Sequence, residues 1–90
     1  MALYLSEEDV NSLLTMEIAL DVIENGFRLI ACGGAINNPR SRIRLDQGVF
    51  HLMAAAAPQL GVMGTKTYSS IGSNPPQFYV HLYDIVNGQL

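Results

Sequence analysis

The sequence predicts an α+β fold in which a short N-terminal strand and two helices precede an antiparallel β meander. The apolar residues recur with a helical period of 3.6 as far as Gly33-Gly34 and with a strand period of 2 after it. Short clusters of turn-forming residues then divide the second half into strands. Ninety residues are enough for one domain at most.

The N-terminal half carries clear helix signals. The apolar run at 2–5 predicts the first strand. Ser6 then follows as a candidate N-cap residue with Asp9 three positions later, close to a capping box. Thr15 begins a second helix, whose apolar residues recur at intervals of three and four. The glycine pair at 33–34 ends that helix.

Four further strands are predicted, at 40–45, 48–56, 60–70 and 77–86. A turn at "DQG" joins the first two, Pro58 breaks the second, and the "IGSNPP" segment forms a loop before the last. Asn87-Gly88 is a strong hairpin signal, but two residues follow it. Because a hairpin needs a returning strand, we expect the last strand to lack the partner that would follow it in sequence, and this chain would be the front end of a longer protein or would pair there with another molecule.

Composition narrows the function classes. A formal net charge of −3 and a pI near 5.0 argue against a general nucleic-acid binder or a membrane-surface binder. Charged residues make up 14% of the chain and apolar residues 49%, which predicts a partner surface or further chain over the apolar excess. No signal peptide and no transmembrane segment is recognisable.

The single cysteine, Cys32, forms no internal disulfide, which suits a reducing, cytoplasmic setting, and it is predicted to be a small core residue. Neither a G-x-G-x-x-G fingerprint nor a P-loop is present, and His51 and His81 have no metal-ligand spacing around them. The sequence thus gives no support for nucleotide binding by this chain, for a zinc site or for a cysteine or serine nucleophile.

Cations carry the remaining chemical signal. Arg40, Arg42 and Arg44 alternate along one predicted strand and would share a face, while Lys66 is the one charge in its strand. One interpretation is a charged edge strand that resists aggregation, with a lysine that reaches to water. The other is a carboxylate clamp, since arginine binds carboxylates through a planar fork and lysine adds a point charge or a proton.

An ordered set of motifs runs over nearly the whole chain. It begins with "LYLSEEDVNSLLTMEIALDVIENGFRLIACGG", continues with "NPRSRIRL", "HLMAAA", "GTKTYSS" and "SN", and closes with "YDIVNGQL". The set resembles the N-terminal domain of the ornithine cyclodeaminase/mu-crystallin family, which opens with a strand and a helix pair. That family usually has Met-Pro-Ala in place of the "MAA" of "HLMAAA", Gly-x-Lys at the position of "GTK", and an Asp-x-x-x-Gly turn similar to the closing segment.

The resemblance implies a two-domain protein. Residues 1–90 would be part of a substrate-binding and dimerisation domain, and a Rossmann domain outside this chain would bind NAD or NADP. Family activities include cyclising deamination of ornithine, alanine dehydrogenation and reduction of cyclic ketimines. They share hydride transfer between a nicotinamide and the carbon that bears an amine or imine. The resemblance also implies a homodimer formed through the β-sheet.

Site residues follow from the resemblance position by position. Arg40 matches the residue that clamps the substrate carboxylate, and Lys66 matches the lysine that reaches the substrate and assists proton transfer. His51 stands where ornithine cyclodeaminases place a glutamate that handles substrate nitrogen, which puts ornithine specificity in doubt. Met53 would line the pocket, and Asn74 matches a loop asparagine. Arg42 and Arg44 have no assignable counterpart.

The departures from the family pattern that matter most are absences. The dinucleotide fingerprint, a second arginine and an aspartate near the nicotinamide do not occur in these 90 residues. We therefore expect this chain alone to bind no cofactor and to turn over no substrate. Two other classes stay open, a non-catalytic ligand-binding protein and a homodimerisation module.

Overall fold

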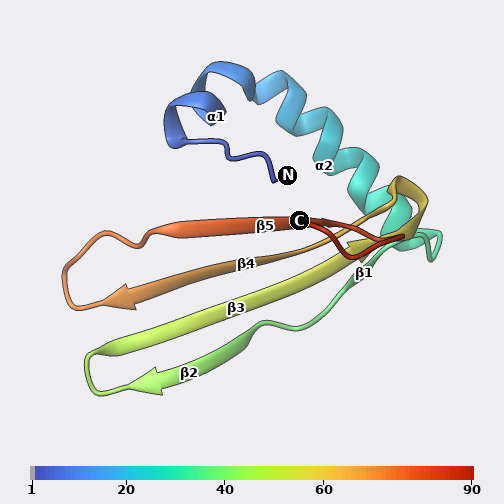
Figure 1. The fold of residues 1–90 in the computed structure, drawn as a ribbon. Coiled ribbons are helices and arrows are strands. Elements are labelled where there is room, and N and C mark those ends of the chain that lie inside the picture. The colour runs from blue at the N-terminus through green and yellow to red at the C-terminus, as the bar shows by residue number, and fades with distance from the viewer. Residues whose placement is uncertain (1) are drawn as a thin grey trace.

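A computed structural model describes residues 2–90 and shows a helical layer on one side of a single antiparallel sheet (Figure 1). The elements are α1 (Glu7–Leu13), α2 (Met16–Ala31), β1 (Ile36–Asn37), β2 (Ser41–Leu45), β3 (Gly48–Ala57), the 3-10 helix η1 (Pro58–Leu60), β4 (Val62–Ile71) and β5 (Phe78–Asp84). The strand order is β1-β3-β4-β5, and β2 also pairs with β3. The predicted α+β class and antiparallel meander are confirmed.

Local side-chain chemistry sets both helix starts. The Ser6 hydroxyl accepts a hydrogen bond from the Asp9 amide at 3.2 Å, and the Asp9 carboxylate accepts one from the Ser6 amide at 2.9 Å, which completes the capping box. Hydrogen bonds from Ser6 hold the pKa of the Asp9 carboxyl below its ordinary value, and the bond from the Ser6 backbone amide has the larger effect. The Thr15 hydroxyl accepts from the Ile18 amide at 3.2 Å and begins α2 in the same way.

The end of α2 is a Schellman motif. Gly33 has φ of +77°, in the left-handed region that favours glycine, and the Gly34 amide donates to the Leu29 carbonyl at 2.7 Å. The predicted helix end at the glycine pair is confirmed. Cys32 is the C-cap residue and is exposed, so its prediction as a core residue is wrong. The reason is that Cys32 stands at the turn out of the helix, where the described chain leaves its side chain uncovered.

The predicted N-terminal strand at 2–5 is also wrong. These residues have no strand partner, and Leu3 is 85% exposed. A short apolar run forms a strand only when a neighbouring edge completes its hydrogen bonds, and no strand of the described sheet pairs with this segment. The sequence pattern did not indicate β1 at Ile36–Asn37, which pairs with Ala55 and Ala56.

A chain reversal follows β5, where Asn87-Gly88 predicted a turn. The Gly88 amide donates to the Asp84 carbonyl and the Asp84 amide donates to the Gln89 carbonyl, both at 2.8 Å. Four residues therefore lie between the closing pair, instead of the two of the tightest hairpin. The position of the turn is confirmed, and its loop is longer.

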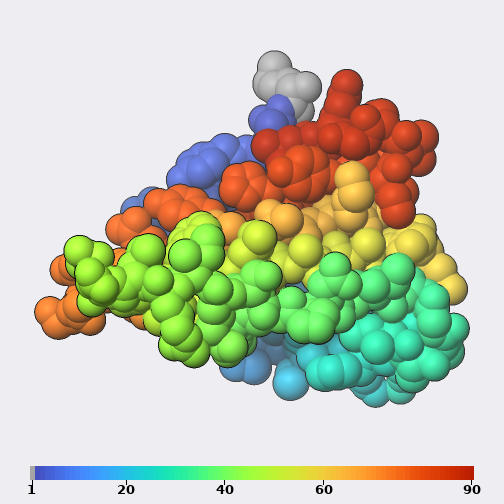
Figure 2. Space-filling view, turned by 90° about the horizontal axis from the view of Figure 1, so that it is seen from below, coloured from blue at the N-terminus to red at the C-terminus, as the bar shows by residue number. Residues whose placement is uncertain are grey.

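The register divides the sheet into two faces, because cross-strand partners point the same way and neighbours along a strand alternate. The helix-side face carries Met53, Lys66 and Val80, which line a cavity of about 580 Å³ together with α2 residues such as Val22 and Leu29. The open face carries the alternate positions Ile43, Leu45, Phe50, Leu52, Ala54 and Met63. Figure 2, seen from below, shows strand residues over most of the surface and part of α2 at its lower edge.

Packing between the two layers is loose. No apolar side chain of residues 2–90 is buried, and Ile23 and Phe27 on the apolar stripe of α2 are 58% and 68% exposed. Since burial of apolar surface is the main force that stabilises a domain, both layers leave surface available to further protein. No helix in this part of the chain is long and apolar enough to cross a membrane.

Candidate carboxylate-binding site

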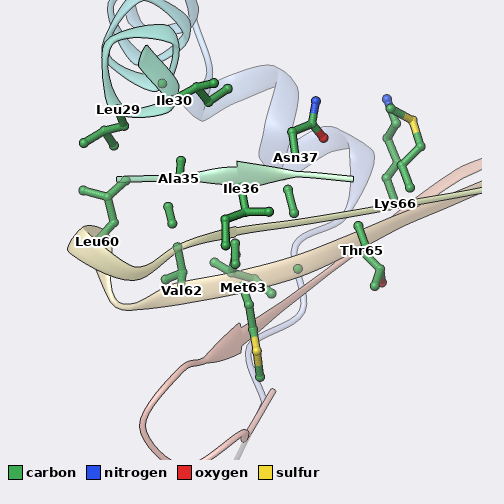
Figure 3. A pocket seen from close by; sticks show the side chains of 18 of the residues that line it. Leu29, Ile30, Ala35, Ile36, Asn37, Leu60, Val62, Met63, Thr65 and Lys66 are labelled. Atoms are coloured by element: carbon green, nitrogen blue, oxygen red, sulfur yellow. The ribbon is translucent and has the colours of Figure 1, made fainter. Parts of the chain in front are cut away.

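Four of the five predicted substrate-site residues lie on or beside the helix-side face. Met53 pairs with Lys66, and His51 pairs with Tyr68 one row away. Arg40 precedes β2, whose first residue Ser41 pairs with Leu52, so Arg40 continues toward the row of Met53. Figure 3 shows the Lys66 side chain on the same side of the strands as Leu29 and Ile30 of α2, with Thr65 and Met63 on the opposite side.

Arg40 and Lys66 converge on one aromatic ring. The Arg40 Cζ lies 6.0 Å and the Lys66 Nζ 5.9 Å from the centre of the Tyr68 ring, and the Lys66 Nζ lies 5.7 Å from that of Phe78. Within residues 2–90 neither cation forms a salt bridge, whereas Arg28 pairs with Glu24 at 2.7 Å. The two charges are thus uncompensated by any carboxylate of the described chain, which favours an anionic ligand.

Three rings form a stack across β3, β4 and β5. His51 and Tyr68 have centroids 4.3 Å apart and planes 12° apart, and Tyr68 and Phe78 have centroids 4.6 Å apart. These spacings match the distance between adjacent strands, since the three residues are register partners. Sequence reasoning missed Tyr68 and Phe78. The alternation from Lys66 to Tyr68 could have placed Tyr68 on this face, but Phe78 required the register.

The surroundings of His51 lower its pKa and so favour the neutral ring. It is 8% exposed, and its Nδ1 has no hydrogen-bond partner among the described residues. Burial is the largest cause that lowers the pKa of His51, and the guanidinium groups of Arg42, Arg40 and Arg44 lower it further. All three arginines therefore influence this point, as expected if they share a face. A positively charged ligand group would meet the same repulsion.

Stability should depend on pH through His51. The unfolded chain takes up a proton near the ordinary value of 6.5, whereas the folded chain takes it up only at lower pH. The free energy of unfolding should therefore fall as pH drops from 7.5 through 6.5 toward the lowered pKa. Urea denaturation at several pH values measures this. His51→Phe should flatten the dependence, while a His81→Phe control should keep it, and the reverse pattern would contradict the assignment.

Asn74, Arg42 and Arg44 are not among the residues that converge on the Tyr68 ring. Asn74 sits in the loop after β4, which ends at Ile71, five positions and roughly 17 Å beyond Lys66 along the strand. The structure therefore does not bring Asn74 together with Lys66. Arg42 and Arg44 lie on β2 and pair with His51 and Val49 of β3. Strand β2 has a strand neighbour on one side only. Their place on an edge also fits protection of that edge by charge.

Comparison with known proteins finds similarity in sequence and in fold. No family model matches the chain. It is 36% identical over 73 residues to an alanine dehydrogenase of Archaeoglobus fulgidus, a match that covers 81% of this chain and 22% of that protein.

Two solved structures share the fold. A probable ornithine cyclodeaminase from Bordetella pertussis Tohama I superposes with a TM-score of 0.81 at 25% identity, over 89% of this chain and 25% of that one. An archaeal alanine dehydrogenase dimer with bound NAD superposes with a TM-score of 0.82 at 27% identity, over 91% and 27%. The chain thus spans about a quarter of the length of these proteins, and over that span it is similar to alanine dehydrogenases and an ornithine cyclodeaminase in both sequence and fold.

Proposed function

We propose that residues 1–90 supply the carboxylate-binding part of an NAD(P)-dependent enzyme that acts on a small amino or imino acid. The observation that carries this proposal is the convergence of Arg40 and Lys66 on the Tyr68 ring, with no carboxylate of the described chain to neutralise them. Its support is the similarity to alanine dehydrogenase and ornithine cyclodeaminase.

Each side chain has a distinct role in this proposal. Arg40 binds the substrate carboxylate through two parallel hydrogen bonds. Lys66 adds a positive charge and exchanges a proton with the substrate nitrogen as it changes between amine and imine. Met53, which pairs with Lys66 and lines the inter-layer cavity, provides apolar contact with the rest of the substrate.

His51 argues for a substrate without a second ammonium group. A neutral imidazole near three arginines does not offer the negative charge that would pair with the side chain of ornithine. We therefore favour chemistry of the alanine dehydrogenase or ketimine reductase type over cyclodeamination.

In this proposal, a domain outside this chain binds the dinucleotide. The described residues form one antiparallel sheet and no parallel strand–helix–strand unit, which a Rossmann site requires. NAD is the cofactor in the archaeal relative's structure, and either NAD or NADP would supply hydride chemistry in the intact protein. The cytoplasmic setting stays a prediction. The isolated chain should show no turnover.

Binding of simple carboxylates tests the clamp. We expect pyruvate and L-alanine to shift amide resonances of β3 and β4 in NMR titrations of the 90-residue chain. Arg40→Gln should weaken binding roughly 10- to 100-fold, the usual range for loss of a hydrogen bond to a charged group. Arg28→Gln is the matched control, because Arg28 lies on α2 and pairs with Glu24. Equal affinity of the two variants would overturn the proposal.

A second candidate role is homodimerisation through the open face. Ile43 and Leu45 on this face are 58% and 50% exposed, and Phe50 and Leu52 lie beside them on β3. The archaeal relative with bound NAD is a dimer. The two roles are compatible, because the cations lie on one face of the sheet and this apolar surface on the other. A binder without catalysis would use the same clamp, and turnover by the intact protein separates it from an enzyme.

A further inference from the structure

We infer that Tyr68 is a positioning residue, which holds Arg40 and Lys66 at the separation that a single carboxylate requires. This inference rests on the proposed function and deepens it. It assigns a role to a residue that touches both cations and that the family resemblance did not single out.

Tyr68 is the shared contact of the two cations. The Arg40 Cζ and the Lys66 Nζ lie 6.0 and 5.9 Å from its ring centre, and they come from different parts of the chain, Arg40 before β2 and Lys66 within β4. Both distances are within the range of cation–π attraction. Within residues 2–90 neither side chain forms a salt bridge, so aromatic contacts are what restrains them, and Tyr68 is the ring that both cations share.

Such a restraint matters because both side chains are long. Free Arg and Lys side chains populate many rotamers, and ordering them opposes ligand binding. Two like charges also repel each other when no anion is present. An aromatic ring that attracts both cations offsets these costs before the ligand arrives, which is preorganisation of the site.

The ring is itself fixed from both sides along the sheet. His51 stacks on Tyr68 at 4.3 Å and Phe78 contacts it at 4.6 Å. Phe78 also lies 5.7 Å from the Lys66 Nζ, so Lys66 has two aromatic contacts and Arg40 one. Loss of Tyr68 should therefore affect Arg40 more completely than Lys66.

The test compares Tyr68→Phe with Tyr68→Leu. Phenylalanine keeps the ring and should bind pyruvate like the unchanged chain, whereas leucine should weaken binding roughly five- to tenfold by loss of two cation–π contacts. Tyr4→Leu is the control, since Tyr4 is 83% exposed and makes none of these ring contacts. Amide spectra of the strands report whether each variant keeps its sheet.

A second readout does not depend on how the variants fold. In the unchanged chain the methylene protons of Lys66 next to Nζ should resonate upfield of their free value, because two rings lie within 6 Å. An unshifted Lys66 signal, or wild-type affinity of Tyr68→Leu, overturns the positioning role while leaving the clamp intact. If Arg40→Gln binds pyruvate normally, the proposed function fails, which is a different result from failure of Tyr68 alone.

Discussion

Gly48→Ala is expected to disrupt the sheet and to destabilise the fold strongly, although it adds a single methyl group. A Cβ at this position would lie 1.9 Å from the Ser70 carbonyl oxygen and 2.9 Å from its carbon, and the φ of Gly48 is +156°. Gly48 pairs with Leu45 on one side and Ile71 on the other, so relief of the clash requires two strands to separate locally. We expect the free energy of unfolding to fall by roughly 3 kcal/mol or more, as measured by urea denaturation.

Gly26→Ala is the matched control for that prediction. An added Cβ at Gly26 meets nothing within 4 Å, and the residue lies inside α2. Alanine in a helix interior is more favourable than glycine by about 0.5–1 kcal/mol. The two identical substitutions should therefore have opposite signs. A Gly48→Ala chain as stable as the unchanged one would show that the register at Gly48 and Ile71 is incorrect.

Leu52→Asp should abolish self-association of the chain if the open face is a dimer interface. Leu52 lies on β3 near the centre of that face and is 41% exposed. β3 and β4 have ten residues each, β2 has five and β5 has seven. At about 3.3 Å per residue and about 4.8 Å between strands, these four strands cover on the order of 500 Å² per partner. That area is somewhat more than half of the roughly 800 Å² per partner of standard interfaces. A buried, unpaired carboxylate in each copy would strongly oppose association.

Sedimentation velocity over a concentration series measures this effect. Leu20→Asp on α2 makes the same substitution at a side chain that is 63% exposed. If the chain associates nonspecifically through any exposed apolar surface, both substitutions should lower the fraction of dimer. If the interface is the open face, Leu52→Asp alone should lower it. A monomeric unchanged chain at all concentrations would contradict dimerisation and leave the open face for another segment of protein.

The elements that the sequence predicted correctly are those set by neighbours in the chain. Ser6 with Asp9, Thr15, and the Gly33-Gly34 pair determine helix ends through contacts within a few residues. The strands around "DQG" and Pro58 were found for the same reason. The predicted strand at 2–5 was wrong because a strand requires a hydrogen-bonded neighbour, which an apolar run alone does not provide.

The candidate site shows where sequence reasoning ended. Lys66, His51 and Met53 were proposed from the resemblance, and period-two alternation puts Lys66 and Tyr68 on one face. The alignment of Tyr68 with both His51 and Phe78 depends on a register across three strands, which is set by turn lengths and loop closure. The sequence likewise did not predict the loose packing of α2 on the sheet. The apolar stripe of α2 predicts a buried face but does not say which surface covers it.

The meander has a consequence for the order of folding. Every pairing that builds the ring stack and places Met53 beside Lys66 joins strands that are consecutive in the chain. Hairpins of this kind form on the microsecond timescale, because the loop that must close is short. Contacts of low sequence separation also form during synthesis as soon as both strands have left the ribosome. The candidate carboxylate-binding site is thus expected to be an early folding unit, and the helices and any covering protein dock onto it afterwards.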